Sequence, residues 1–203
     1  MIMIIMEAND FLNKSVNLFI ARGVTYTRWG KTSCPSSTGA ELVYSGRAGG
    51  TRYNSRGGAA DRLCLPDNPD YISGTPAASF SQKSVVHGAE YEFLGNSPLR
   101  NLFEHNIPCA ICDAPTRSRV IMIPAKTACP SSWTMEYYGY LTTELDSHYR
   151  SSFTCLDVNP EVVAGGSANT NPSNFYHTIT DCNGLLCPPY VNNLLLSCVV
   201  CTK

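Results

Sequence analysis

Apolar residues in this chain fall into short runs that are separated by glycine, proline, asparagine and serine. The runs at 24–29 and 119–124 combine β-branched, aromatic and other apolar residues, which is typical of β-strands. No stretch keeps a helical spacing for more than about two turns, and the best short candidate is 98–104. Stretches such as 165–172 have the composition of turns or exposed loops. The pattern therefore predicts a mostly β protein.

One short segment occurs twice along the chain. The sequence KTSCPSS at 31–37 returns as KTACPSS at 126–132, so six of seven residues match at an offset of 95 positions (34 to 129). A match of this length is not expected by chance in 203 residues, and self-similarity at a fixed offset is the mark of an internal repeat. The segment therefore indicates a gene duplication.

The repeat extends to later parts of both halves. Tyr-Ser-Gly at 44–46 aligns with Tyr-Tyr-Gly at 137–139, and the motif Cys-Leu-x-x-Asn-Pro-acid occurs at 64–70 and again at 155–161. The last common anchor is a Cys-x-x-Cys pair, at 109–112 and 198–201. The offset falls from 95 to 89, as expected if loops shortened in the second copy. We therefore predict two subdomains, 23–115 and 116–203, after an N-terminal extension at 1–22.

The cysteine content favours disulfides. An even number of cysteines in a turn-rich chain favours disulfides and an oxidising compartment. Zinc is the alternative because of the two Cys-x-x-Cys motifs, but these are far apart and their inner residues are apolar and β-forming. A redox motif would need a surrounding βαβ pattern, and none is present. The ten cysteines stand at positions 34, 64, 109, 112, 129, 155, 182, 187, 198 and 201.

Strand geometry limits how these cysteines pair. Residues i and i+3 of a strand point to opposite faces, so the two cysteines of each Cys-x-x-Cys should bond to different partners. Cys182 and Cys187 occur only in the second half, and their simplest pairing is with each other. In each half the cysteine that precedes proline can then join either the first or the second cysteine of the motif. Both patterns remain open on geometry alone.

With the halves aligned, the sequence resembles the C-terminal non-collagenous domain of type IV collagen. That family shows Cys-x-Val-Cys-Glu-Ala-Pro, a strand, Cys-Pro-x-Gly-Trp and a Gly-Tyr, and here the junction has CAICDAP at 109–115, CPSSW at 129–133 and YGY at 138–140. The chain end, CVVCTK at 198–203, is similar to the family's Cys-x-Val-Cys-x-Lys. The likeness covers about 23–203 and is nearest to the tail domains of sponge-type short-chain (spongin-like) collagens and their free-standing invertebrate relatives.

The resemblance implies a mostly β fold made by tandem duplication of two similar subdomains, each stapled by its own disulfides, with segment swapping, and often grouped with C-type-lectin-like folds. There are departures, since the first half lacks the family's local third bridge and no Gly-X-Y repeat is present. The pairing that the resemblance implies is Cys34 with Cys112, Cys64 with Cys109, Cys129 with Cys201, Cys155 with Cys198, and Cys182 with Cys187.

Little in the sequence points to catalysis. The four histidines are scattered, and no Gly-x-Ser-x-Gly motif is present. The acids of the two Asn-Pro motifs could bind calcium, but capping or turn roles explain them more simply. We therefore expect no enzyme activity, no metal and no cofactor. A formal net charge of −1 also removes the simplest argument for nucleic-acid binding.

The leading hypothesis is a secreted, non-enzymatic extracellular matrix or assembly module. It would act by protein–protein association, as a homo-oligomer or with other matrix proteins. The alternative is a lectin-like or innate recognition module that binds glycans through loops 46–62 and 164–174. Loop 46–62 is rich in glycine and contains four arginines, which could bind sulfated glycans. An ordinary solvated loop could have the same composition. The four arginines are Arg47, Arg52, Arg56 and Arg62.

The N-terminal extension does not plainly supply a secretion signal. The apolar run at 1–6 is too short for a signal core or a membrane span, and acidic residues follow it. Two interpretations are open: a defective or mispredicted signal sequence, or a short helix of a chain truncated upstream. No later run approaches the length of a membrane span.

Overall fold

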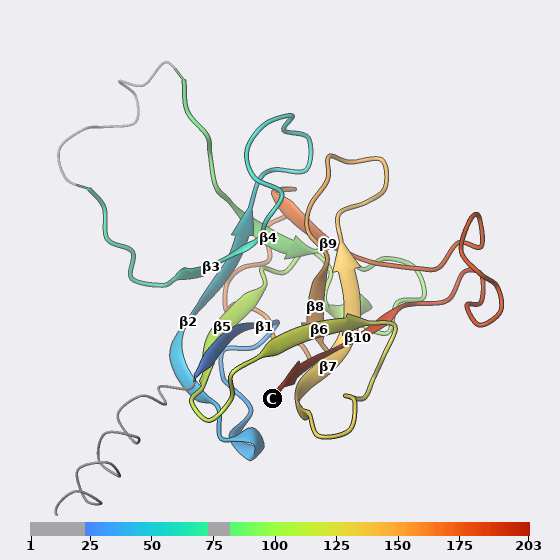
Figure 1. Ribbon diagram of the computed structural model, residues 1–203. Coiled ribbons are helices and arrows are strands. Elements are labelled where there is room, and N and C mark those ends of the chain that lie inside the picture. The colour runs from blue at the N-terminus through green and yellow to red at the C-terminus, as the bar shows by residue number, and fades with distance from the viewer. Residues whose placement is uncertain (1–22, 73–81) are drawn as a thin grey trace, which may run out of the picture.

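The computed structural model describes residues 23–72 and 82–203, so the interpretations of 1–22 lie outside the described residues. The described part is confirmed as mostly β (Figure 1). The short helical candidate at 98–104 contains a 3-10 turn at Arg100–Leu102. A second 3-10 turn spans Ser36–Thr38. The strands are β1 (Val24–Trp29), β2 (Glu41–Gly50), β3 (Leu63–Pro66), β4 (His87–Tyr91), β5 (Pro108–Ala114), β6 (Val120–Pro124), β7 (Thr134–Thr143), β8 (Thr154–Asp157), β9 (Ser173–His177) and β10 (Ser197–Thr202).

Strands of the two halves interleave in a single hydrogen-bonded network. The order is β6-β10-β7-β8-β1-β5-β2-β4-β9, and β3 pairs with β2 beside this path. Two parallel pairs join the halves, β1 with β8 and β4 with β9. Because β9 also pairs with β7, part of the path closes on itself. The halves are therefore linked at two places along the sheet.

Within each half the strand pairings follow one pattern. In the first half β5 lies between β1 and β2, and β2 also pairs with β3 and β4. In the second half β10 lies between β6 and β7, and β7 also pairs with β8 and β9. The registers agree as well, since Cys109 faces Gly46 and Cys198 faces Gly139. Positions aligned by the sequence repeat thus occupy equivalent places.

Two glycines explain how β3 can lie so close to β2, and β8 so close to β7. A Cβ atom at Gly46 would collide with the backbone oxygen of Leu65, and one at Gly139 would collide with that of Leu156. Backbone atoms cannot move aside as a flexible side chain can, so no other residue fits either position without a shift of the strand. The glycine of the repeated Tyr-x-Gly segment is therefore a packing requirement.

Each of the two hydrophobic cores draws on both halves. One core packs Tyr26 and Ala110 of the first half against Tyr137 and Val200 of the second, together with several cysteines. The other packs first-half residues, Tyr91 among them, against second-half residues. Burial of this shared apolar surface stabilises both halves together, because neither core is complete without the other half.

All ten cysteines are paired, and the pairs are those that the collagen resemblance implies. Within each Cys-x-x-Cys the two cysteines bond to different segments, as alternating side chains require. Five disulfides favour an oxidising environment. Among the described residues no helix is long and apolar enough to cross a membrane. The bonds are Cys34–Cys112, Cys64–Cys109, Cys129–Cys201, Cys155–Cys198 and Cys182–Cys187.

Candidate association surface

The contact between β1 and β8 is the place where the Asn-Pro-acid turn of the second half meets the first half. Trp29 faces Leu156 in parallel register, and just beyond them the Glu161 backbone N–H donates to the Gly30 carbonyl at 2.7 Å. The Lys31 ammonium lies 2.9 Å from the Glu161 carboxylate. The turn is therefore held by both a backbone hydrogen bond and an ion pair.

Further polar contacts fix this turn. Burial alone would raise the pKa of the Glu161 carboxyl, but hydrogen bonds from Lys31 and Thr32 outweigh that effect and lower it. Asp157 forms an ion pair with Arg28 at 2.7 Å. The acids of this second motif thus have protein partners, as a structural turn requires.

Tyr137 ties the two strands of this contact together. Its hydroxyl lies 2.9 Å from the Thr27 carbonyl of β1 and 3.1 Å from the Cys155 carbonyl of β8. The side chain is 5% exposed. Tyr44, the residue aligned with Tyr137, contacts the Cys64 carbonyl at 2.9 Å and is 36% exposed. Tyr44 therefore makes one of the two kinds of contact that Tyr137 makes: its hydroxyl reaches the neighbouring strand of its own half but no strand that corresponds to β1 among the described residues.

The strands that correspond to β1 and β8 are β6 and β3, and the described residues show no pairing between them. Among the described strands, β6 pairs only with β10, and β3 only with β2. Arg119 and Lys203 exchange two backbone hydrogen bonds, so by alternation the N–H groups of Val120 and Met122 point away from β10. Ile121 of this edge strand is 46% exposed, whereas its aligned residue Tyr26 is 7% exposed.

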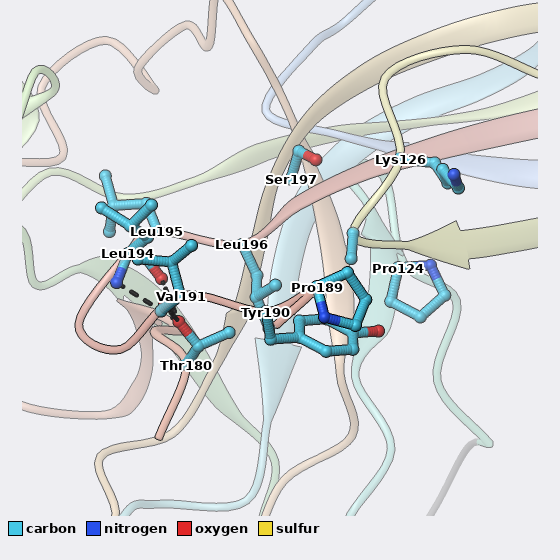
Figure 2. A pocket seen from close by; sticks show the side chains of 11 residues that line it. Pro124, Lys126, Thr180, Pro189, Tyr190, Val191, Leu194, Leu195, Leu196 and Ser197 are labelled. Carbon is cyan, nitrogen blue, oxygen red and sulfur yellow. Dashed lines mark hydrogen bonds between the residues drawn. The ribbon is translucent and has the colours of Figure 1, made fainter. Parts of the chain in front are cut away.

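A pocket of about 360 Å³ lies at the end of β6 (Figure 2). Pro124 and Lys126 stand on one side of it, and Leu194 and Leu195 stand on the other. The loop 178–196 supplies this second side and projects from the strands in Figure 1. The remaining lining residues are Ala125, Thr180, Pro189, Tyr190, Val191, Leu196 and Ser197.

Loop 178–196 carries much exposed apolar surface for its length. The Cys182–Cys187 disulfide closes its tip, and the Thr180 hydroxyl contacts the carbonyls of Val191 and Leu194. These contacts hold the loop in a defined shape although few of its side chains are buried. Exposed apolar groups gathered in one place are typical of interaction surfaces. They are Ile179, Leu185, Leu186, Tyr190, Val191, Leu194 and Leu195.

The four arginines proposed as a ligand loop do not form one exposed cluster. Arg47 lies in β2 and forms an exposed ion pair with Asp67, 2.9 Å away. Arg52 and Arg56 remain exposed in the loop and donate to the Asn171 carbonyl and the Tyr149 hydroxyl. The fourth arginine, Arg62, is buried and cannot meet a ligand in solvent. The expectation that all four serve a ligand loop therefore has to be corrected.

Arg62 instead joins the halves from inside. Its guanidinium donates to the Ser152 carbonyl at 2.8 Å, to the Thr154 hydroxyl at 2.6 Å and to the Asn174 carbonyl at 2.6 Å. It also lies 3.9 Å above the centre of the Phe175 ring. Burial lowers its pKa to about 10. All four contacts are second-half residues about 90 or more positions away, so the local sequence gave no sign of them.

A group of buried acids lies near the β4–β9 seam. Burial, with Glu90, Glu104 and Glu144 nearby, raises the pKa of Glu92 to about 7. Glu90 and Glu144 have partners: Glu90 accepts from Thr170, and Glu144 lies 3.1 Å from the His148 ring. One Glu92 carboxylate oxygen has no hydrogen-bond partner in the described residues. This position is therefore a point of pH sensitivity.

Ser97 and His177 form a close pair, with 2.8 Å between the hydroxyl and Nε2. The other ring nitrogen of His177 has no hydrogen-bond partner in the described part of the chain, so no third group orients the ring as in a catalytic triad. Burial lowers the pKa of His177 to about 4. In residues 23–72 and 82–203 no group of three His, Cys, Asp or Glu side chains could hold a metal ion. The pair is best explained as a structural hydrogen bond.

No family model matches this chain, and no solved structure gives a significant match.

Proposed function

We propose that this protein is a non-enzymatic, extracellular association module, similar to the C-terminal non-collagenous domain of type IV collagen and built from a duplicated β unit. The equivalent strand pairings, the equivalent disulfides and the two close-approach glycines support a duplication. The five disulfides support an extracellular location. Its partners would be further copies of itself or other matrix proteins.

One observation carries the proposal: in residues 23–72 and 82–203 the β1–β8 contact has no counterpart between β6 and β3. The duplicated edges remain open in the described residues and carry exposed apolar side chains, such as Ile121 and Leu63. An open strand edge is a template for pairing with another chain. We therefore propose that β6 of one molecule lies beside β3 of the next in the arrangement of the internal contact. Pro124 stands at the position of Trp29, the residue that pairs with Leu156, and because it has no N–H it can contribute only its carbonyl to the intermolecular pairing.

Tyr44 supports this arrangement. In the internal contact the aligned tyrosine, Tyr137, reaches both β8 and β1. Met122 aligns with Thr27, so pairing of a second molecule would bring the partner's Met122 carbonyl to Tyr44. The contact uses different surfaces on the two molecules. Such head-to-tail contacts build closed rings when the rotation closes and filaments when it does not.

The experiment is sedimentation velocity of the purified, oxidised protein and of an edge variant. Met122→Pro removes an outward N–H without removing a β6–β10 hydrogen bond, and Pro124 already offers no N–H at the next outward position. We expect Met122→Pro to weaken association at least about tenfold, whereas Met122→Val, which keeps the N–H, stays near the wild type. Equal association of the proline variant and the wild type would contradict the edge pairing.

A glycan-recognition function is the second candidate, and one observation favours it. The loop with Arg52 and Arg56 is joined by backbone hydrogen bonds to the second-half loops, from Tyr53 to the Pro172 carbonyl and from Tyr149 to the Tyr53 carbonyl. Three loops thus form one surface with exposed guanidinium groups, which suit sulfate. Binding to sulfated glycans that is lost in Arg52→Ser and Arg56→Ser, by a protein that stays monomeric, would favour this function over association.

A further inference from the structure

The Asn-Pro-acid turn of the second half provides a template for an intermolecular contact. In that turn Pro160 packs against Gly30, and a Cβ atom at Gly30 would lie within 2.9 Å of the Pro160 side chain. Glu161 follows: its backbone N–H donates to the Gly30 carbonyl, and its carboxylate pairs with the Lys31 ammonium. The template thus consists of two contacts: Pro160 packs against the backbone bend at Gly30, and the Glu161 carboxylate pairs with Lys31.

The backbone bend of this template exists a second time, at the pocket beside β6. Ala125 aligns with Gly30, and both have positive φ angles, 58° and 87°. The Gly30 N–H donates to the Pro108 carbonyl and the Ala125 N–H to the Ser197 carbonyl, each at 2.8 Å. Lys126 follows Ala125 as Lys31 follows Gly30. We call the binding site for the turn, formed by the backbone bend and the lysine after it, the seat. The pocket therefore contains a second copy of the seat, in which Ala125 and Lys126 replace Gly30 and Lys31.

The turn that would fit this second seat is the first-half copy, Asn68-Pro69-Asp70. All three residues are exposed. Asp70 aligns with Glu161. In an intermolecular copy of the template, the carboxylate of the partner's Asp70 would therefore form an ion pair with the Lys126 ammonium. The charges are complementary.

Apolar residues beside both sites extend the match. After the second-half turn, the Val163 N–H donates to the Asn106 carbonyl at 3.1 Å. Ile72 aligns with Val163, and Leu195 aligns with Asn106. Ile72 is 100% exposed, its neighbour Tyr71 is 85% exposed, and Leu195 is 44% exposed. The template thus places exposed apolar groups of one molecule over an exposed apolar wall of the next, which removes both from water.

We propose that the pocket at the end of β6 binds the Asn68-Pro69-Asp70 turn of a second copy of this chain. The partner's Asp70 pairs with Lys126, and the partner's Tyr71 and Ile72 cover the Leu194–Leu195 side of the pocket. This inference rests on the proposed self-association and names its principal contact. Ala125 has one methyl group more than Gly30, so the partner's Pro69 must sit slightly farther out than Pro160 does. Ala125→Gly should therefore strengthen association by a few-fold.

A zero-length cross-link tests the contact directly. Unlabelled and ¹⁵N-labelled protein are mixed and treated with a carbodiimide, which joins an amine to a carboxylate only where the two touch. We expect a peptide pair that links Lys126 of one isotope to Asp70 of the other. The Lys31–Glu161 pair, 2.9 Å apart within one molecule, is the internal control. An associated protein that gives the control cross-link but no Lys126–Asp70 cross-link would overturn the proposed seat.

Charge reversal gives a second, independent test. Lys126→Glu and Asp70→Lys should each weaken association about tenfold, and the double variant should recover most of the wild-type affinity. Lys83→Glu, at an exposed lysine outside the pocket, is the matched control. Association that neither single change weakens would refute the seat but leave self-association intact. A wild type that never associates would refute the proposed function itself.

Discussion

Replacement of Arg62 by methionine should destabilise the whole fold. The guanidinium is buried, and it joins the loop before β3 to three second-half acceptors and the Phe175 ring. Methionine keeps most of the apolar contact with Phe175 but can donate no hydrogen bond. The carbonyls of Ser152 and Asn174 would then lose their guanidinium partner inside the protein.

The size of the effect follows from these contacts. Hydrogen bonds to a charged group contribute roughly 1.5–3 kcal/mol each, and three are lost. The burial that lowers the pKa of Arg62 is a cost that the substitution removes, so the net loss is smaller than the sum. We expect the free energy of unfolding to fall by about 3–5 kcal/mol.

Urea unfolding at neutral pH with the disulfides intact measures this loss. With a slope of about 2 kcal/mol per molar, the midpoint should fall by roughly 2 M. Arg52→Met is the matched control, because Arg52 is exposed and donates one hydrogen bond at 3.3 Å. It should cost less than about 1 kcal/mol. Similar midpoints for the two variants would refute the structural role assigned to Arg62.

Two more predictions concern pH and strand packing. Folding raises the pKa of Glu92 from 4.5 to about 7, so the folded state binds the extra proton and stability falls as pH rises through that window. Glu92→Gln should remove this fall and be about 1–2 kcal/mol more stable at pH 8 in thermal unfolding. The comparison of variant with wild type isolates this effect from His177, whose lowered pKa gives the opposite slope between about 4 and 6.5. Gly139→Ala should cost about 3 kcal/mol or more, because its methyl meets the Leu156 oxygen, whereas Gly57→Ala, with open space around it, should cost almost nothing. Equal pH profiles of Glu92→Gln and wild type, or equal melting points of the two alanine variants, would contradict these assignments.

Features that depend on neighbours in sequence could be predicted. The strand at 24–29 and the repeated anchors are local patterns, and a mostly β fold follows from them. The separate partners of Cys109 and Cys112 follow from alternation along one strand. Which partner each one takes depends on the fold as a whole. The collagen resemblance, and not the spacing, implied the pairs that the structure contains.

Features that depend on distant residues could not be predicted. The parallel pairing of β4 with β9 joins Glu90 to Asn174, and neither residue is typical of a buried strand. The local sequence places Arg62 in a solvated loop, because its acceptors lie in the other half of the chain. The open edge of β6 could not be foreseen either, because an edge is defined by the absence of a neighbour in the folded sheet. Aligned residues can therefore have different burial, as Tyr44 and Tyr137 do.

The molar mass of the oxidised protein in solution tests the central claim most directly. Light scattering across a concentration series should give masses above the 22.1 kDa of a single chain, rising with concentration toward a defined oligomer or a growing filament. A mass of 22.1 kDa at every concentration would contradict the claim that the open edges of β3 and β6 join one molecule to the next.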